Sequence, residues 1–152
     1  MIMKRLIVRL PFLEFPPDHT CDGGDRSPEI RLEGLAAESV AVMAVNPFQP
    51  SCCSFSPWII WNIEPMDEIP SGIPKEMVVT LPINAVQGMN DFGKMGYSGP
   101  CPPQGATHRY TFKVYGLDCM LELEPGSPKN ALIQAMQGHV LQYGETMAMY
   151  SR

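Results

Sequence analysis

A histidine and a tyrosine two residues apart, His108 and Tyr110, are the side chains of this sequence with the clearest chemical use. In an extended segment, side chains at i and i+2 point to the same face, so both groups would meet one environment. A histidine titrates near neutral pH and, once protonated, donates hydrogen bonds from both ring nitrogens, while a tyrosine hydroxyl adds another donor. Together these groups have the hydrogen-bond donors that a small anion would need. The alternative is structural: a strand histidine with one backbone partner, and an aromatic residue of the core.

The cysteines do not indicate a metal or redox centre. The chain has an odd number of them, five, with no C-x-x-C pair: Cys21, Cys52, Cys53, Cys101 and Cys119. None of the three histidines is grouped with them at metal-ligand spacing. We therefore expect no metal and no cofactor, and free thiols in a reducing compartment. The adjacent Cys52 and Cys53 are candidates for oxidation or intermolecular pairing.

Composition and charge exclude two classes of partner. The chain has 152 residues, a net charge of −5, and eleven Lys and Arg residues that are scattered along it. Counterion release on nucleic acid requires clustered basic residues, so we expect no nucleic-acid partner. No apolar run reaches the roughly 20 residues of a membrane span, and Arg9 interrupts the short apolar stretch at the start, so no signal peptide is predicted. We expect a single domain, residues 1–152, in the cytoplasm.

The elements that must position these residues are mostly short strands. With 16 Pro and 13 Gly, the chain cannot consist mainly of long helices. Alternating or continuous apolar patterns bounded by turn residues predict strands instead. These patterns occur at residues 6–10, 29–33, 40–45, 58–63 and 110–115, with a further short run at 121–123.

One helix is predicted near the C-terminus, with Ser127 as N-cap and Pro128 at its first position. Gly138 could bend or end it, and His139 would lie on it as a packed residue. Its apolar face is formed at i, i+4 and i+8 by Leu132, Met136 and Val140. The predicted class is therefore mainly β, an antiparallel two-sheet β-sandwich with a short C-terminal helix.

Residues 90–105, NDFGKMGYSGPCPPQG, followed by His108-Arg109-Tyr110, resemble the signature of the phosphatidylethanolamine-binding protein family. The resemblance is closest to its short bacterial and archaeal branch, which is similar to Raf kinase inhibitor protein. It extends from about residue 15 to the end through further motifs: HTCDG at 19–23, SP at 27–28, YGLD at 115–118, AMQGHVL at 135–141 and YSR at 150–152.

The resemblance implies an antiparallel β-sandwich with a small helical flank and a shallow pocket for phosphate-like or carboxylate anions. Proteins of this family bind phospholipid head groups or modulate kinases and serine proteases, and members of this branch often form homodimers. The resemblance places His108 and Tyr110 in the pocket. It assigns the pocket wall to the loop of residues 99–103, and here to Gly99, Cys101 and Pro102. Prolines would fix this loop so that the amides of Gly99 and Cys101 point at an anion.

Cys101 has two interpretations. A cationic histidine nearby would lower the pKa of its thiol, so a nucleophile formed by Cys101 and His108 is conceivable. We prefer the alternative, in which Cys101 is a small buried apolar residue.

The other half of the pocket departs from the family pattern. Where the family carries Asp-Pro-Asp-x-Pro, this chain has Asn46-Pro47-Phe48-Gln49-Pro50. Where the family has a histidine before the aromatic residue of the next strand, this chain has Pro57 before Trp58. Asparagine can donate as well as accept, and the loss of aspartate removes the partner that keeps a histidine charged. With Asn46 in the site, either the pocket suits a more apolar or less charged ligand, or binding is lost and the scaffold is an interaction surface.

The sequence thus predicts a non-enzymatic protein that binds a small anion or a phospho-head group and could modulate a protein partner. No catalytic residue is assigned. The alternative is a protein-interaction module, a serine protease inhibitor or kinase modulator, that acts through an exposed loop at residues 46–57. A hydrolase built on Cys101 and His108 is a third hypothesis.

Overall fold

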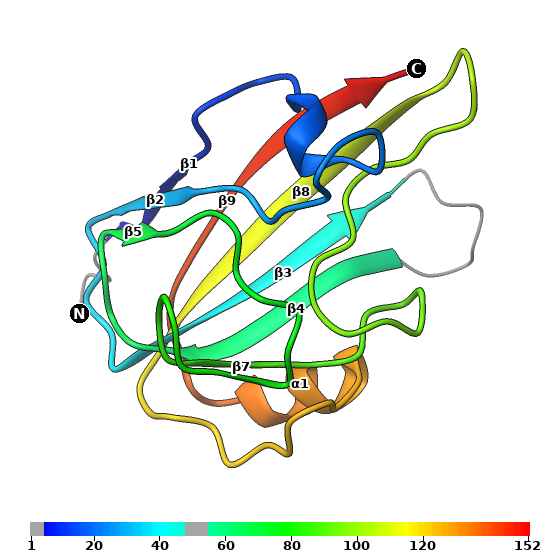
Figure 1. Ribbon diagram of the computed structural model, residues 1–152. Coiled ribbons are helices and arrows are strands. Elements are labelled where there is room, and N and C mark those ends of the chain that lie inside the picture. Colours follow the sequence, from blue (N-terminus) through cyan, green and yellow to red (C-terminus); the bar gives the residue numbers. More distant parts are fainter. Residues whose placement is uncertain (1–4, 48–54) are drawn as a thin grey trace.

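The computed structural model describes residues 5–47 and 55–152, and in this part of the chain two antiparallel sheets and one α-helix form three layers (Figure 1). The larger sheet has the strand order β6-β7-β4-β3-β8-β9 and the smaller the order β1-β2-β5. The strands are β1 (Ile7–Arg9), β2 (Ile30–Glu33), β3 (Ser39–Asn46), β4 (Phe55–Ile63), β5 (Glu68–Ile69), β6 (Val78–Val79), β7 (Ala85–Gln87), β8 (Thr107–Leu117) and β9 (Val140–Ser151), with a 3-10 turn η1 (Pro17–His19) and the helix α1 (Lys129–Met136). The mainly β, two-sheet prediction is confirmed.

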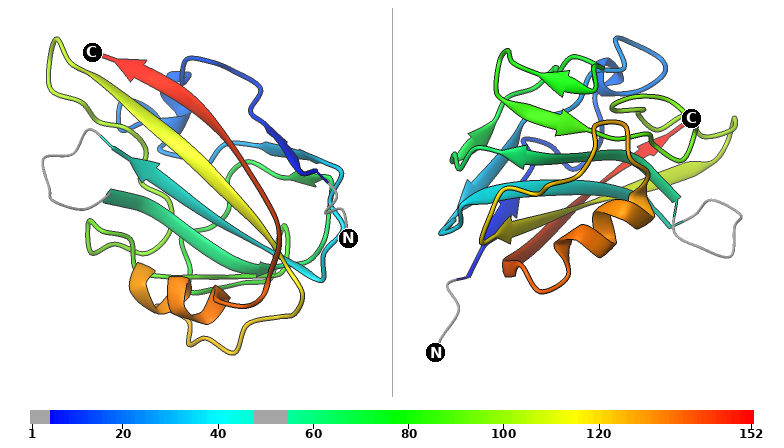
Figure 2. Two further views of the ribbon diagram at one scale, coloured as in Figure 1. Left: turned by 180° about the vertical axis from the view of Figure 1, so that it is seen from behind. Right: turned by 90° about the horizontal axis from the view of Figure 1, so that it is seen from below.

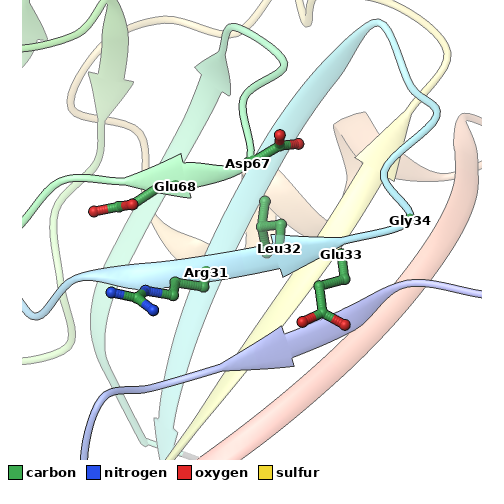
Figure 3. Close-up of a pocket in the computed structure, with 6 residues that line it drawn as sticks. All are labelled: Arg31, Leu32, Glu33, Gly34, Asp67 and Glu68. Carbon is green, nitrogen blue, oxygen red and sulfur yellow. The ribbon is translucent and has the colours of Figure 1, made fainter.

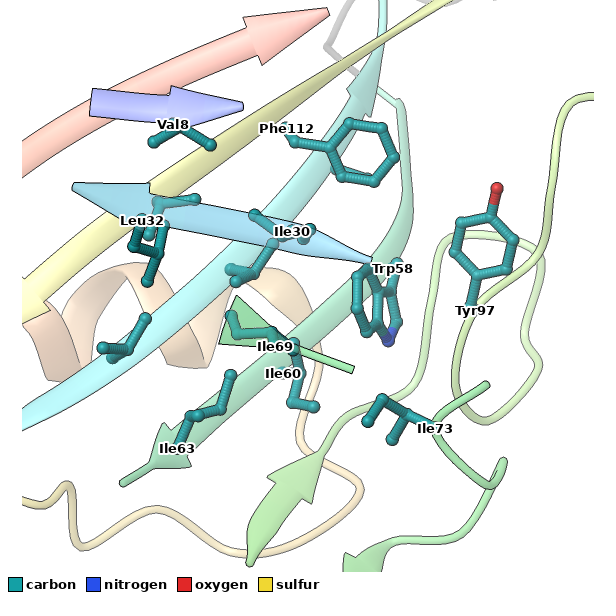
Figure 4. Packing of buried hydrophobic residues seen from close by; sticks show 14 of the residues in the cluster. Val8, Ile30, Leu32, Trp58, Ile60, Ile63, Ile69, Ile73, Tyr97 and Phe112 are labelled. Carbon is teal, nitrogen blue, oxygen red and sulfur yellow. The ribbon is translucent and has the colours of Figure 1, made fainter. Parts of the chain in front are cut away.

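The main core lies between the two sheets. Because side chains alternate along a strand, β2 buries Ile30 and Leu32 and exposes the residues between them. Ile30 and Ile69 of the small sheet pack against residues such as Trp58 of β4 and Phe112 of β8 (Figure 4). The even-numbered residues of β8 therefore point toward this core, which fixes the direction of His108 and Tyr110.

The helix α1 covers the opposite face of the large sheet (Figure 2). Leu132 and Met136 are buried against Met43, Ile59 and Trp61, so this second core uses the odd-numbered positions of β3 and β4. Within residues 5–47 and 55–152, no helix is long and apolar enough to cross a membrane.

The predicted helix was too long at both ends. It begins after Pro128, which is the N-cap, and Ser127 makes no side-chain cap but donates its hydroxyl to the carbonyl of Glu124. It ends at Met136 because Gly138 adopts a positive φ of 80°. Val140 therefore belongs to β9, and His139 lies in the turn between the helix and that strand.

The strands predicted at residues 6–10, 29–33, 40–45, 58–63 and 110–115 are confirmed. They correspond to β1, β2, β3, β4 and β8, with ends that differ by a few residues. The run at 121–123 is not a strand; its Leu121 amide and carbonyl bond instead to the side chain of Asn62. The long strand β9, which pairs with the whole of β8, was not predicted.

Candidate functional site

His108 and Tyr110 share strand β8 and one of its faces, as the sequence predicts. Tyr110 is buried, with 1% of its surface exposed, and its ring packs at an edge-on angle against Phe15. Its hydroxyl donates to the carbonyl of Ser98 at 2.9 Å. Burial, together with the charge of Asp25, raises the pKa of Tyr110. The Tyr110 hydroxyl is therefore bonded to the loop that contains Ser98 and is not available to a ligand as a donor. Tyr110 is a core aromatic residue that anchors this loop to β8.

His108 is paired with Asn46, the last residue of β3. Asn46 is 2% exposed, and its side-chain nitrogen Nδ2 lies 3.3 Å from His108 Nδ1. An amide nitrogen can only donate, so Nδ1 accepts and the ring proton sits on Nε2. Burial of the half-exposed ring also lowers the pKa of His108. The pair therefore keeps His108 neutral near pH 7, with Nε2–H as its donor, in place of the imidazolium that the sequence suggested.

The amide of Gly99 does not point at an anion from solution. It donates to Oδ1 of Asp25 at 2.7 Å, and the other oxygen of that carboxylate accepts from Nζ of Lys75 at 3.0 Å. The carboxylate of Asp25 therefore occupies the position at the Gly99 amide that was predicted for a bound anion. That expectation for Gly99 is wrong, since a loop predicted from prolines alone could not reveal a partner 74 residues away in the chain.

Cys101 is joined to Cys21 by a disulfide bond. The prediction of free thiols is wrong for these two residues, and Cys101 is neither a nucleophile nor a buried apolar residue, because it is oxidised and exposed. The argument from free thiols to a reducing compartment falls with it. Among the described residues Cys119 is a free thiol, while Cys52 and Cys53 lie outside the described residues.

The C-terminal strand fastens the same loop from outside. Arg152 donates through Nη1 to the carbonyl of Pro102 at 3.1 Å, and its Nη2 lies 3.3 Å from a carboxylate oxygen of Asp22. The hydroxyl of Tyr150 donates to the other oxygen of Asp22. Pro102 is buried. Sequence reasoning missed Asp22, Asp25 and Arg152 as parts of the site, although they lie within or beside the motifs that carry the family resemblance.

A small cavity lies beside this loop. It has a volume of about 170 Å³ and is lined by Cys21, Asp25, Phe92, Lys94, Ser98, Gly99 and Cys101. A water molecule occupies about 30 Å³ in the liquid, so the cavity has room for a group of a few heavy atoms. Gly99 and Cys101 line this cavity, whereas His108, Tyr110, Pro102 and Asn46, which were predicted to share one pocket with them, do not. Ser98 links the two regions, since its carbonyl accepts from Tyr110 and its amide donates to the carbonyl of Pro57.

The predicted altered half of the pocket is described only in part. Pro57 is buried on β4 and contributes its carbonyl to Ser98. Pro47 is exposed. Phe48, Gln49 and Pro50 lie outside the described residues, as does most of the loop on which the interaction-module hypothesis depends.

A larger hollow lies elsewhere and does not suit an anion. It lies between β2 and β5, has a volume of about 580 Å³, and is lined by Arg31, Leu32, Glu33, Gly34, Asp67 and Glu68 (Figure 3). Its charged side chains are mostly carboxylates. A shared hydrogen bond raises the pKa of Glu68 and lowers that of Glu29, which marks a surface already crowded with negative charge.

Comparison with known proteins places this geometry in a family. The family model described as "Phosphatidylethanolamine-binding protein" matches residues 10–151. The chain belongs to the phosphatidylethanolamine-binding protein family. It is 48% identical over 140 residues to a protein of Pyrococcus horikoshii described as a UPF0098 protein, a match that covers 90% of this chain and 70% of the relative. A UPF0098 protein of Methanothermobacter thermautotrophicus is 41% identical, with 90% of each chain covered.

Two solved structures of the family are similar throughout. A phosphatidylethanolamine-binding protein homologue of Chlamydia trachomatis superposes with a TM-score of 0.84 at 29% identity, covering 98% of this chain and 99% of the other. YbcL of E. coli, described as a member of the mammalian family, superposes with a TM-score of 0.85 at 26% identity, covering 97% and 99%. The predicted resemblance to the prokaryotic branch is therefore confirmed.

Proposed function

We propose that this protein is a non-enzymatic binding protein for a small ligand with a phosphate or carboxylate group, held by Nε2–H of His108. The observation that carries the proposal is the neutral Asn46–His108 pair at the end of β8. The pair aligns Nδ1 inward, so Nε2 is the ring nitrogen left to meet a ligand. Family membership supports the ligand class, and the oxidised state of Cys101 supports a role without covalent chemistry.

The charges near the site favour a ligand that carries little net negative charge. His108 supplies a donor but no positive charge, since its pKa is lowered by burial. Asp25 and Asp22 add carboxylates, each already bonded to the protein, and Lys94 lines the adjacent cavity. Among the described residues that line the cavity, Lys94 is the one basic side chain. A doubly charged phosphate would need more positive charge than that, whereas a zwitterionic head group or a monocarboxylate would not. These charges favour a pocket for a less charged ligand over a pocket for a phosphate dianion.

The test is calorimetric titration of phosphoethanolamine and, separately, acetate into the wild type and into His108→Ala. A hydrogen bond to a charged acceptor contributes about 1.5–3 kcal/mol, so the substitution should weaken binding by roughly ten- to 150-fold. Gln104→Ala is the matched control, because Gln104 is exposed on the turn that precedes β8. It should leave the affinity unchanged.

The pH profile distinguishes the neutral donor from an imidazolium. With a lowered pKa, acetate affinity should stay nearly flat between about pH 7 and pH 8.5 and rise only on the acid side of the reference value. A steep fall of affinity across that alkaline range would show that the ring binds as a cation. Affinity unaffected by His108→Ala would remove this histidine from the site.

A further inference from the structure

A second cluster of reactive side chains lies at the opposite end of β8. His139 Nδ1 is 2.8 Å from Oδ1 of Asp118 and 3.5 Å from Sγ of Cys119. One ligand atom from each of the three residues can be chosen so that all lie within 4.8 Å of one another. His108 and Leu117, at the two ends of β8, are separated by roughly 30 Å at the usual rise per residue. The cluster is therefore independent of the proposed binding site.

Strand pairing brings these residues together. Leu117 pairs with Val140, so the residue after β8 meets the residue before β9, and the amide of Asp118 donates to the carbonyl of His139 at 2.9 Å. Asp118 and Cys119 are adjacent in the chain, but His139 follows about twenty residues later across a helix. Spacing along the sequence could not reveal this cluster.

The backbone that carries the three side chains is well anchored. The carbonyl of Cys119 accepts from the hydroxyl of Ser39 at 2.7 Å, and the amide of His139 donates to the carbonyl of Met136 at 3.0 Å. Two residues on, Leu121 is held by both atoms of the Asn62 amide. Ligands on a fixed backbone bind a metal with less ordering cost than ligands on a mobile loop.

The cluster is open to solvent on one side. The side chains of Asp118 and His139 are 43% and 44% exposed. A hollow of about 430 Å³ adjoins the cluster and is lined by Cys119, Met120, Leu121, Glu122, Ala135 and His139. A cation could enter from this hollow, and the carboxylate of Glu122 or a water molecule could complete its coordination.

The surroundings suit a cation better than a nucleophile. The carboxylate of Asp118 lies within the cluster, and Glu122 lines the adjoining hollow. Reactive cysteines lie in electropositive surroundings that stabilise the thiolate, and these surroundings are the reverse. A divalent cation would offset the negative charge of the Asp118 and Glu122 carboxylates and of the Cys119 thiolate that forms when the metal binds.

We propose that Asp118, Cys119 and His139 bind one zinc-like divalent cation through Oδ1, Sγ and Nδ1. Thiolate, imidazole and carboxylate together are the donor set of Zn²⁺, whereas Ca²⁺ and Mg²⁺ prefer oxygen alone. Binding would replace the hydrogen bonds that now converge on Nδ1 and release the thiol proton to solvent. Three protein ligands leave a fourth position for Glu122 or water.

Cobalt(II) is the first probe, because it reports a thiolate ligand by a charge-transfer absorption band. The background is Cys52→Ser/Cys53→Ser, which, with Cys21 and Cys101 in a disulfide, leaves Cys119 as the free thiol. This protein should bind one equivalent of Co²⁺ with that band, and Zn²⁺ should displace it. Zn²⁺ affinity is then measured by competition with a chromophoric chelator.

Cys119→Ser should abolish the band and weaken Zn²⁺ binding by more than about 100-fold, since even outer-shell changes cost about 10–100-fold. His139→Gln should weaken it comparably, and the exposed Glu124→Gln should change nothing. Circular dichroism and thermal melting of each variant show whether it is folded; the conservative Cys119→Ser keeps the test decisive if His139→Gln unfolds. Absence of stoichiometric binding, wild-type affinity in folded Cys119→Ser, or equal loss in Glu124→Gln would overturn the proposal and leave Asp118–His139 as a surface ion pair.

Discussion

Replacing Asn46 by Asp should convert His108 from a neutral donor into a cation. The substitution puts a carboxylate oxygen where Nδ2 now lies, 3.3 Å from His108 Nδ1. The oxygen can only accept, so it favours a protonated Nδ1. The attraction of two unit charges at this distance is about 5 kcal/mol at an effective dielectric constant of about 20. Because the ring is partly exposed, solvent screens much of this.

A neighbouring opposite charge usually shifts a pKa by about 1–3 units, so we expect the pKa of His108 to rise by that amount, or about 1.4–4 kcal/mol. The assay is an NMR titration of the His108 ring protons in the wild type and in Asn46→Asp. Asn130→Asp adds the same charge on the exposed side of α1 and is the control. It should leave the His108 titration where it is.

The pH dependence of the free energy of unfolding provides a second measurement of the effect of Asn46→Asp. In the wild type the folded-state pKa of His108 is lowered, so the unfolded state binds more protons between the two values and stability rises with pH through that window. If Asn46→Asp raises the folded pKa of His108 above the unfolded one, the contribution is instead present at low pH and is lost as pH rises through the folded value. An unchanged His108 titration in Asn46→Asp would refute the contact between the two side chains and the tautomer derived from it.

Two further predictions concern stability. Cys21→Ser/Cys101→Ser opens a loop of 80 residues. It should lower the free energy of unfolding, measured in denaturant, by roughly 3–5 kcal/mol. An equal denaturation midpoint for the oxidised wild type and this variant would contradict a stabilising disulfide. Trp58→Phe removes the indole donor to Gln87 at 2.8 Å and should cost about 1–3 kcal/mol more than Trp61→Phe, because the buried indole nitrogen of Trp61 has no hydrogen-bond partner among the described residues. Equal costs would show that the Gln87 bond adds nothing.

The parts of the fold that could be predicted are those whose burial follows a simple alternation. Strand β2 buries Ile30 and Leu32 and exposes the residues between, so its pattern gives both its type and its core face. Strand β9 reverses this logic. Its inward positions hold Gln142, Gly144 and Ala148, while large apolar residues such as Tyr143 and Met149 face outward. Position 144 must be glycine-sized because a Cβ on Gly144 would lie 2.6 Å from the carbonyl oxygen of Leu6, and Gln142 is polar, so the inward face of β9 shows no apolar alternation.

The parts of the site that could not be predicted depend on contacts between distant segments. The shared face of His108 and Tyr110 follows from their spacing. The hydrogen bond from the Tyr110 hydroxyl to the Ser98 carbonyl does not, because it joins two different segments of the chain. Cys21 and Cys101 are 80 residues apart. Neither this separation nor the odd number of cysteines indicates that these two form a disulfide bond. Asp25 reaches Gly99 across a similar separation. In each case the motif was visible and its partner was not.

The burial of Asn46 bears on whether this pocket is re-tuned or abandoned. An amide removed from water costs several kcal/mol unless it is hydrogen-bonded, so a scaffold with no ligand would be more stable with an apolar residue at this position. Asn46 is instead 2% exposed and bonded to a half-exposed histidine. A buried polar group that fixes the tautomer of an accessible one is an arrangement for binding, because preorganised donors lose less freedom when a ligand arrives. The buried Asn46–His108 pair is therefore consistent with the proposal that the pocket still binds a ligand, with a changed charge.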